Sequence, residues 1–153
     1  MASEKDQAER ARWMAALNRA DPARLEAAWA DLAPPPAHRW LRPAETGLVM
    51  VRGRAGGTGQ SFNLGEMTMT RAAVVVEGEP PLVGFGYVAG RVARHAELAA
   101  LFDALLQDDA RRADLLATVI APLEEDAAAA MAARSAAVAA TRVDFTTMVR
   151  GAG

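Results

Sequence analysis

The chain contains no cysteine and only two histidines, His38 and His95, among its 153 residues. Without thiols it can form no disulfide, no thiolate nucleophile and no zinc–thiolate cluster. The sequence also has no His-x-x-x-His or Asp-x-Asp spacing that would join a histidine to carboxylates on one face. We therefore expect no metal site formed by this chain alone, and the missing thiols fit a reducing compartment.

Long apolar runs and an excess of one charge are also lacking. No segment approaches the roughly 18 uninterrupted apolar residues of a membrane span, and residues 1–12 are too charged for a signal peptide. Lysine plus arginine number 17 and aspartate plus glutamate 19, a formal net charge of -2 that would not attract polyanions at long range. These absences predict a cytoplasmic protein that binds neither membranes nor nucleic acid.

The usual signatures of a catalytic nucleophile are missing as well. No Gly-x-Ser-x-Gly elbow occurs, and Ser3, Ser61 and Ser135 have no adjacent histidine. Glu45 and Glu66 could be paired acids, but each lies next to a predicted strand, where a carboxylate more often caps a turn or pairs with an arginine. Catalysis by this chain alone is therefore not expected.

The N-terminal part predicts two short helices. Asp21 followed by Pro22 is typical of a helix start, and an apolar stripe follows it. An earlier apolar stripe begins at Trp13 and predicts a first helix. We expect a helical pair over residues 1–33 and, because prolines cannot continue a helix, a stiff connector over residues 34–39.

From Trp40 the apolar period changes to that of strands. The segments that alternate or are rich in β-branched residues are 48–52, 62–64, 66–70, 74–76 and 83–89, with turns at 53–59 and 77–81. Consecutive strands joined by short turns favour an antiparallel meander of three or four strands. Gly84 and Gly86 share one face of the last strand, where another segment could approach the backbone closely.

After Gly90 the helical period returns. A broad apolar stripe over residues 98–106 predicts a helix that covers the sheet, and a shorter helix is expected to stop at Pro122. A long, alanine-rich helix follows. The predicted fold is α+β, with residues 40–151 forming the body of a single domain.

The last helix carries a thin apolar seam that favours contact with another polypeptide. Ala127, Met131, Arg134, Val138 and Thr141 recur at a four-three spacing that supplies little apolar bulk. We expect this helix and the tail behind it to dock on a partner. The docking candidates are Met131, Val138, Thr141, Arg142, Asp144, Phe145, Met148 and Arg150.

Two arginine-flanked segments could contact an anion such as phosphate. The first is the loop with Arg52, Arg54, Gly56, Gly57, Thr58 and Gly59, and the second is the helix start with Arg91, Arg94 and His95. Glycine-rich loops and helix N-termini both present N–H groups to anions. The alternatives are a hairpin turn with glycines at positive φ for the loop, and solvated arginines with a packed histidine for the helix start.

Several stretches, in order from Arg42 to the C-terminus, resemble one family. They include Arg42-Pro43-Ala44-Glu45-Thr46-Gly47, Gly56-Gly57-Thr58-Gly59, Phe62-Asn63-Leu64-Gly65-Glu66-Met67-Thr68, Gly90-Arg91, Leu101-Phe102-Asp103-Ala104-Leu105-Leu106-Gln107 and Thr141-Arg142-Val143-Asp144-Phe145. The chain thereby resembles PhnG, the G subunit of the carbon–phosphorus lyase core complex. It departs from the family at Val92, where an acidic residue is usual, and at Thr146, where a second aromatic is usual.

The resemblance implies a role in phosphonate breakdown, as a subunit of ribose 1-methylphosphonate 5-triphosphate synthase. The H, I and J subunits would be its partners, the catalytic I subunit most directly. That assembly would transfer the ribose 5-triphosphate moiety of ATP, held with magnesium, to an alkylphosphonate and release adenine. No cofactor is expected on this chain alone. The alternative is a non-catalytic interaction module that stabilises the I subunit.

Overall fold

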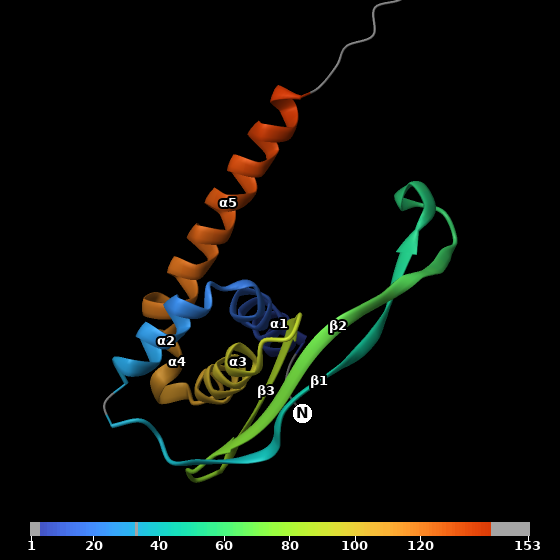
Figure 1. Cartoon of the computed structure of the whole chain (residues 1–153). Coiled ribbons are helices and arrows are strands. Elements are labelled where there is room, and N and C mark those ends of the chain that lie inside the picture. Colours follow the sequence, from blue (N-terminus) through green and yellow to red (C-terminus); the bar gives the residue numbers. More distant parts are fainter. Residues whose placement is uncertain (1–3, 33, 142–153) are drawn as a thin grey trace, which may run out of the picture.

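The computed structural model describes residues 4–32 and 34–141, and these form an α+β fold. In chain order the elements are α1 (Glu4–Arg19), α2 (Pro22–Ala30), β1 (His38–Arg54), the 3-10 turn η1 (Ala55–Gly57), β2 (Ser61–Val76), β3 (Leu82–Ala89), α3 (Ala93–Leu105), α4 (Asp109–Leu115), the π-turn η2 (Leu116–Ile120) and α5 (Ala121–Ala140). The described strands form one antiparallel sheet of order β1-β2-β3, which confirms the predicted meander. Figure 1 shows the helices on one side of this sheet, with the β1–β2 hairpin and α5 projecting from the body.

The N-terminal helices α1 and α2 form the predicted pair. The Asp21 carboxylate accepts a hydrogen bond from Ala23 N at 2.9 Å, and Pro22 occupies the first turn of α2. This N-cap satisfies a backbone donor that the helix leaves free. Trp13, Leu17 and Leu25 are buried in the same apolar cluster as α3 and the sheet.

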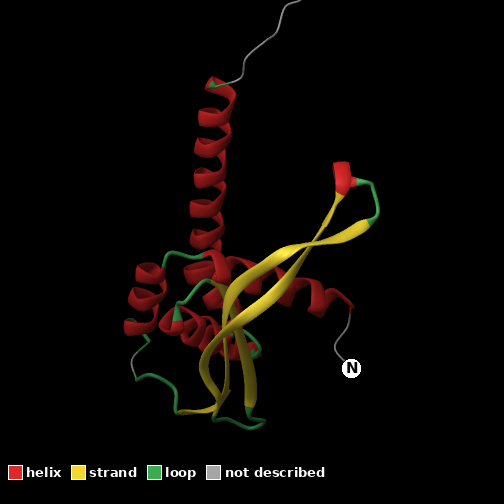
Figure 2. Ribbon diagram, turned by 45° about the vertical axis from the view of Figure 1, so that its right-hand side comes forward, coloured by secondary structure: helices red, strands yellow, loops and turns green. Residues whose placement is uncertain are grey.

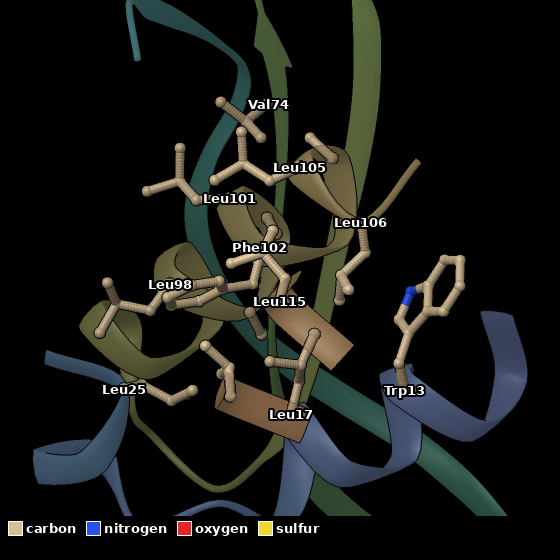
Figure 3. Close-up of a cluster of buried hydrophobic side chains, with 14 of the residues drawn as sticks. Trp13, Leu17, Leu25, Val74, Leu98, Leu101, Phe102, Leu105, Leu106 and Leu115 are labelled. Atoms are coloured by element: carbon tan, nitrogen blue, oxygen red, sulfur yellow. The ribbon is translucent and has the colours of Figure 1, made fainter. Parts of the chain in front are cut away.

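Helix α3 is the centre of the core. Ten of its thirteen residues are buried, so it has no solvent face of the kind an amphipathic surface helix keeps. Figure 3 shows Leu98, Leu101, Phe102 and Leu105 among side chains from the N-terminal helices and the sheet. The helix therefore covers the sheet, as its broad apolar stripe predicts, and the α1–α2 pair packs against it as well.

Two glycines of β3 bring the sheet into close contact with α3. A Cβ atom on Gly84 would lie 2.0 Å from Ala100 O, and one on Gly86 would lie 2.0 Å from Ala96 O. The close approach predicted from these glycines is therefore confirmed, and the approaching segment is α3. The alternate residues Phe85 and Tyr87 point away from α3 and are 37% and 43% exposed.

The predicted stop at Pro122 is wrong. Helix α4 passes into the π-turn η2, in which Ala121 N bonds to Leu116 O, and α5 begins at once with Pro122 in its first turn. A proline is tolerated in the first turn of a helix because its missing N–H would not be used there. The wider turn lets the chain continue as a helix instead of stopping.

Helix α5 leaves the body after Leu123 and projects alone, as Figure 2 also shows. Its base is fixed by two ion pairs, Arg12 to Glu124 and Arg24 to Asp126, the latter at 2.7 Å. Every residue from 125 to 141 is exposed. Alanine has the highest intrinsic helix propensity, which helps such a segment stay helical without packing. In the described part of the chain, no helix has the length and apolarity needed to cross a membrane.

Candidate functional site

The glycine-rich loop forms the tip of the β1–β2 hairpin. The two strands pair as far as Arg54 and Ser61, and Gly56 and Gly57 take positive φ values of 61° and 79°. These values match the hairpin alternative, in which glycine supplies a backbone conformation that other residues rarely adopt. At the tip, Arg52 Nη2 donates to Ser61 Oγ at 3.0 Å.

Both tip arginines are exposed. Arg54 Nη1 lies 3.4 Å from Gly59 O, and Thr58 is exposed beside it. Neither Arg52 nor Arg54 forms an ion pair with the residues that the structure describes. The tip therefore presents two guanidinium groups whose positive charges are not neutralised within the described chain.

A buried threonine fixes the turn before α3. Thr70 Oγ1 donates to Gly90 O at 2.6 Å and accepts from Val92 N at 3.2 Å. Val92 is the N-cap of α3 and has no capping side chain of its own. Thr70 accepts from the backbone N–H of this N-cap residue, the donor that the second side chain of a capping box satisfies in other helices. Arg91 lies in this pinned turn, exposed, and makes no ion pair with the described residues.

Arg94 and His95 join α3 to the N-terminal helices. Arg94 Nε and Nη2 donate to the Glu26 carboxylate at 2.6 and 3.0 Å, and these hydrogen bonds lower the pKa of Glu26 below its ordinary value. His95 is buried, with Nε2 2.8 Å from Leu17 O. The structure thus places His95 as the packing alternative describes, and it engages Arg94 with an acid.

The two arginine-flanked segments do not meet within this chain. Gly90 N bonds to Thr68 O near the body, whereas Arg54 pairs with Ser61 at the tip. Thr68 is seven residue steps from Ser61 along β2, which is roughly 23 Å at the usual rise of a strand. If both segments contact a phosphate, they contact different parts of a ligand or complete two different sites.

The paired acids are also apart. Glu45 accepts hydrogen bonds from Arg42 and from Arg71. Both bonds lower the pKa of Glu45 below its ordinary value, the bond from Arg42 more than the bond from Arg71. Glu66 lies further along the hairpin, opposite Met50. Glu45 therefore holds neighbouring strands together by ion pairs, as the alternative to acid–base chemistry describes.

A buried aspartate, Asp103, joins three elements and was not found by sequence reasoning. Arg10 Nε and Nη2 donate to its two carboxylate oxygens at 3.1 and 2.7 Å, and Trp13 Nε1 donates at 2.9 Å. Phe85 N, on the edge of β3, donates at 2.9 Å. The Asp103 side chain has no solvent exposure, so it anchors α1 and β3 to α3 and cannot reach a substrate.

The docking candidates lie at the other projection of the molecule. Met131 and Val138 are 66% and 65% exposed on α5, and the exposed Thr141 ends it. The remaining candidates, Arg142, Asp144, Phe145, Met148 and Arg150, lie outside the described residues. Within the described ranges, no cluster of three or more histidine, aspartate or glutamate side chains could hold a metal ion.

Comparison with known proteins identifies the family. Residues 8–151 match the family model described as phosphonate metabolism protein PhnG. Over 149 residues the chain is 46% identical to the alpha-D-ribose 1-methylphosphonate 5-triphosphate synthase subunit PhnG of Rhizobium meliloti (strain 1021), an alignment that covers 94% of this chain and 90% of that relative. A match of this length includes the pinned turn, the hairpin and α5, and the chain therefore belongs to the PhnG family.

Proposed function

We propose that this protein is the G subunit of an alpha-D-ribose 1-methylphosphonate 5-triphosphate synthase. It acts with the H, I and J subunits of the carbon–phosphorus lyase core complex, the I subunit most directly. The assembly transfers the ribose 5-triphosphate moiety of ATP, bound with magnesium, to an alkylphosphonate and releases adenine. The 46% identity to a subunit of that name, over 94% of this chain, carries the proposal.

The geometry supports an accessory role in the assembly. In the described residues, His95 is buried against Leu17 O and Glu45 is engaged by two arginines, so neither is free to act as a base. The hairpin and α5 expose apolar side chains that include Leu48, at 64%, and Met131. Surfaces of this kind are typical of contacts between subunits.

Omission of this subunit tests the proposal. The H, I and J subunits co-expressed without it are expected to release adenine from ATP and methylphosphonate only at background level, and the purified chain alone is expected to release none. Addition of the chain to the co-expressed set should restore activity. Adenine is quantified by liquid chromatography. Normal turnover by the chain alone, or full activity of the set that lacks it, would show the proposal to be wrong.

Arg91 provides a test of substrate contact. Arg91→Ala in the assembled complex is expected to weaken ATP binding about tenfold, the effect of one lost charge-assisted hydrogen bond. The double variant Arg52→Ala/Arg54→Ala should act similarly if the tip completes a neighbour's site. Arg19→Ala, which removes an exposed arginine at the end of α1, is the matched control. Binding is measured from the ATP dependence of adenine release, and assembly by gel filtration.

The same variants distinguish the second candidate function. The exposed seam of α5 favours an interaction module that makes no contact with substrate and stabilises the I subunit. For such a module, Arg91→Ala should leave ATP binding unchanged. Loss of assembly with unaltered ATP affinity in the remaining complex would indicate that these arginines form a purely structural edge.

A further inference from the structure

The outer face of the sheet, the face turned away from α3, carries a continuous apolar stripe. Alternate residues of the paired strands place their side chains on one face, and the register of β1, β2 and β3 puts the stripe residues side by side. From the hairpin tip to the body the apolar stripe consists of Phe62, Val51, Val49, Met67, Met69 and Tyr87.

The stripe is open to solvent. Phe62 is 45% exposed, Tyr87 43% and Val49 37%, and the other three are half-buried. Beyond the body the stripe is carried by a ribbon of β1 and β2 alone, which Figure 1 shows standing clear of the helices. An isolated two-stranded ribbon is marginally stable in water, and a contiguous exposed apolar patch marks an interaction site.

A depression lies beside the stripe at Gly47. It has a volume of about 370 Å³, and Val49, Met69, Arg71 and Tyr87 contribute to its lining. A Cβ atom added to Gly47 would meet no atom within 4 Å, so the missing side chain is what leaves this space. The backbone of Gly47 does not have a positive φ, and no local strain requires glycine there.

The charged side chains beside the depression indicate what kind of partner covers the stripe. On the outer face of the described sheet, Glu45 is the only acid, and it is shared by Arg42 and Arg71. One positive charge therefore remains in excess beside the depression. A second copy of this chain would bring the same arginines and no spare carboxylate, so the charge pattern favours a different polypeptide over a homodimer.

We infer that the outer face docks another polypeptide of the assembly, which places an apolar side chain in the depression at Gly47 and a carboxylate beside Arg71. This inference rests on the proposed function, because it requires that the chain be a subunit. It assigns a partner surface separate from the seam of α5. The contact continues along the stripe toward Phe62, so that the ribbon is covered in the assembly.

Gly47→Leu tests the inference, because leucine fills the depression without disturbing the strand. The variant chain alone should unfold at the same temperature as the unsubstituted chain or slightly above it. When a tagged variant is co-expressed with the H, I and J subunits, their recovery with it should fall at least about tenfold, as expected when a pocket at an interface is overfilled. Val49→Arg, which puts a charge on the stripe and leaves the depression open, should have a similar effect.

Asn63→Leu is the matched control. Asn63 is exposed and pairs with Arg52, on the opposite face of the ribbon, so the same leucine should leave recovery unchanged. Equal recovery with Gly47→Leu and the unsubstituted chain would overturn the inference and leave the proposed function intact. Equal loss with Asn63→Leu would overturn its assignment to the outer face. If the unsubstituted chain recovers none of the three subunits, both proposals are wrong.

Discussion

Asp103→Ala is expected to lower the free energy of unfolding of the isolated chain by about 3 kcal/mol. Alanine cannot accept the hydrogen bonds that Arg10, Trp13 and Phe85 N donate to the carboxylate. Losing one partner of a buried pair leaves the other charge uncompensated, which costs about 3–5 kcal/mol. The lower end applies because the Arg10 side chain keeps 33% of its exposure and can be hydrated again.

Urea denaturation monitored by circular dichroism measures this effect. Asp126→Ala is the matched control, since Asp126 also pairs with an arginine but its side chain is 51% exposed. Exposed pairs contribute less than about 1 kcal/mol, so the control should change little. Asp103→Asn keeps one acceptor and should fall between the two. If Asp103→Ala were no more harmful than Asp126→Ala, the hydrogen bonds of Asp103 would not stabilise the fold.

The sequence predicted most elements of the fold because their local signals are strong. The N-cap at Asp21, the apolar period over 98–106 and the glycines at 84 and 86 each correspond to observed structure. The buried role of Asp103 was not predicted because a single acid within an apolar stripe is usually a solvent-facing residue. Its burial depends on Arg10, 93 residues away in the chain, and no local pattern contains that partner.

The two strands of the hairpin were predicted as several shorter segments, but β1 and β2 are each one long strand. Pro43, Gly47 and Gly53 interrupt the β-forming residues of β1, which nevertheless runs from His38 to Arg54. Register shifts in the β1–β2 pairing, one of them between Arg42 and Glu45, absorb irregular positions without ending the strand. The reach of the ribbon is a property of the pairing, so sequence reasoning could not show that the tip arginines lie roughly 23 Å from the helix start.

The candidate site was predictable in its residues but not in its grouping. Arginines before a glycine loop and at a helix start are visible in the sequence, and the structure leaves Arg52, Arg54 and Arg91 exposed. Arg94 is hydrogen-bonded to Glu26, and His95 to Leu17 O, because α1 and α2 pack on α3. The role of Thr70 was likewise hidden, because its bonds join residues 20 and 22 positions apart.

Gly86→Ala is expected to destabilise the isolated chain by about 3 kcal/mol, the upper part of the usual range for an overfilled core. The new Cβ would lie 2.0 Å from Ala96 O and 3.0 Å from Ala100 N, and both are backbone atoms of a helix that cannot rotate aside. Helix α3 or strand β3 must therefore move as a unit. Because α3 also holds Asp103, the shift should weaken the bond from Phe85 N as well.

Gly47→Ala is the control for this prediction, because it adds the same methyl group to the same sheet in open space. It should leave stability unchanged or raise it slightly, since glycine in a strand costs conformational entropy that alanine does not. Thermal and urea unfolding of both variants measure the difference. A loss for Gly86→Ala as small as the change for Gly47→Ala would mean that α3 can move away from the sheet at little cost. The close strand–helix contact would then contribute little to holding the central helix, and with it the pinned turn of Arg91, in place.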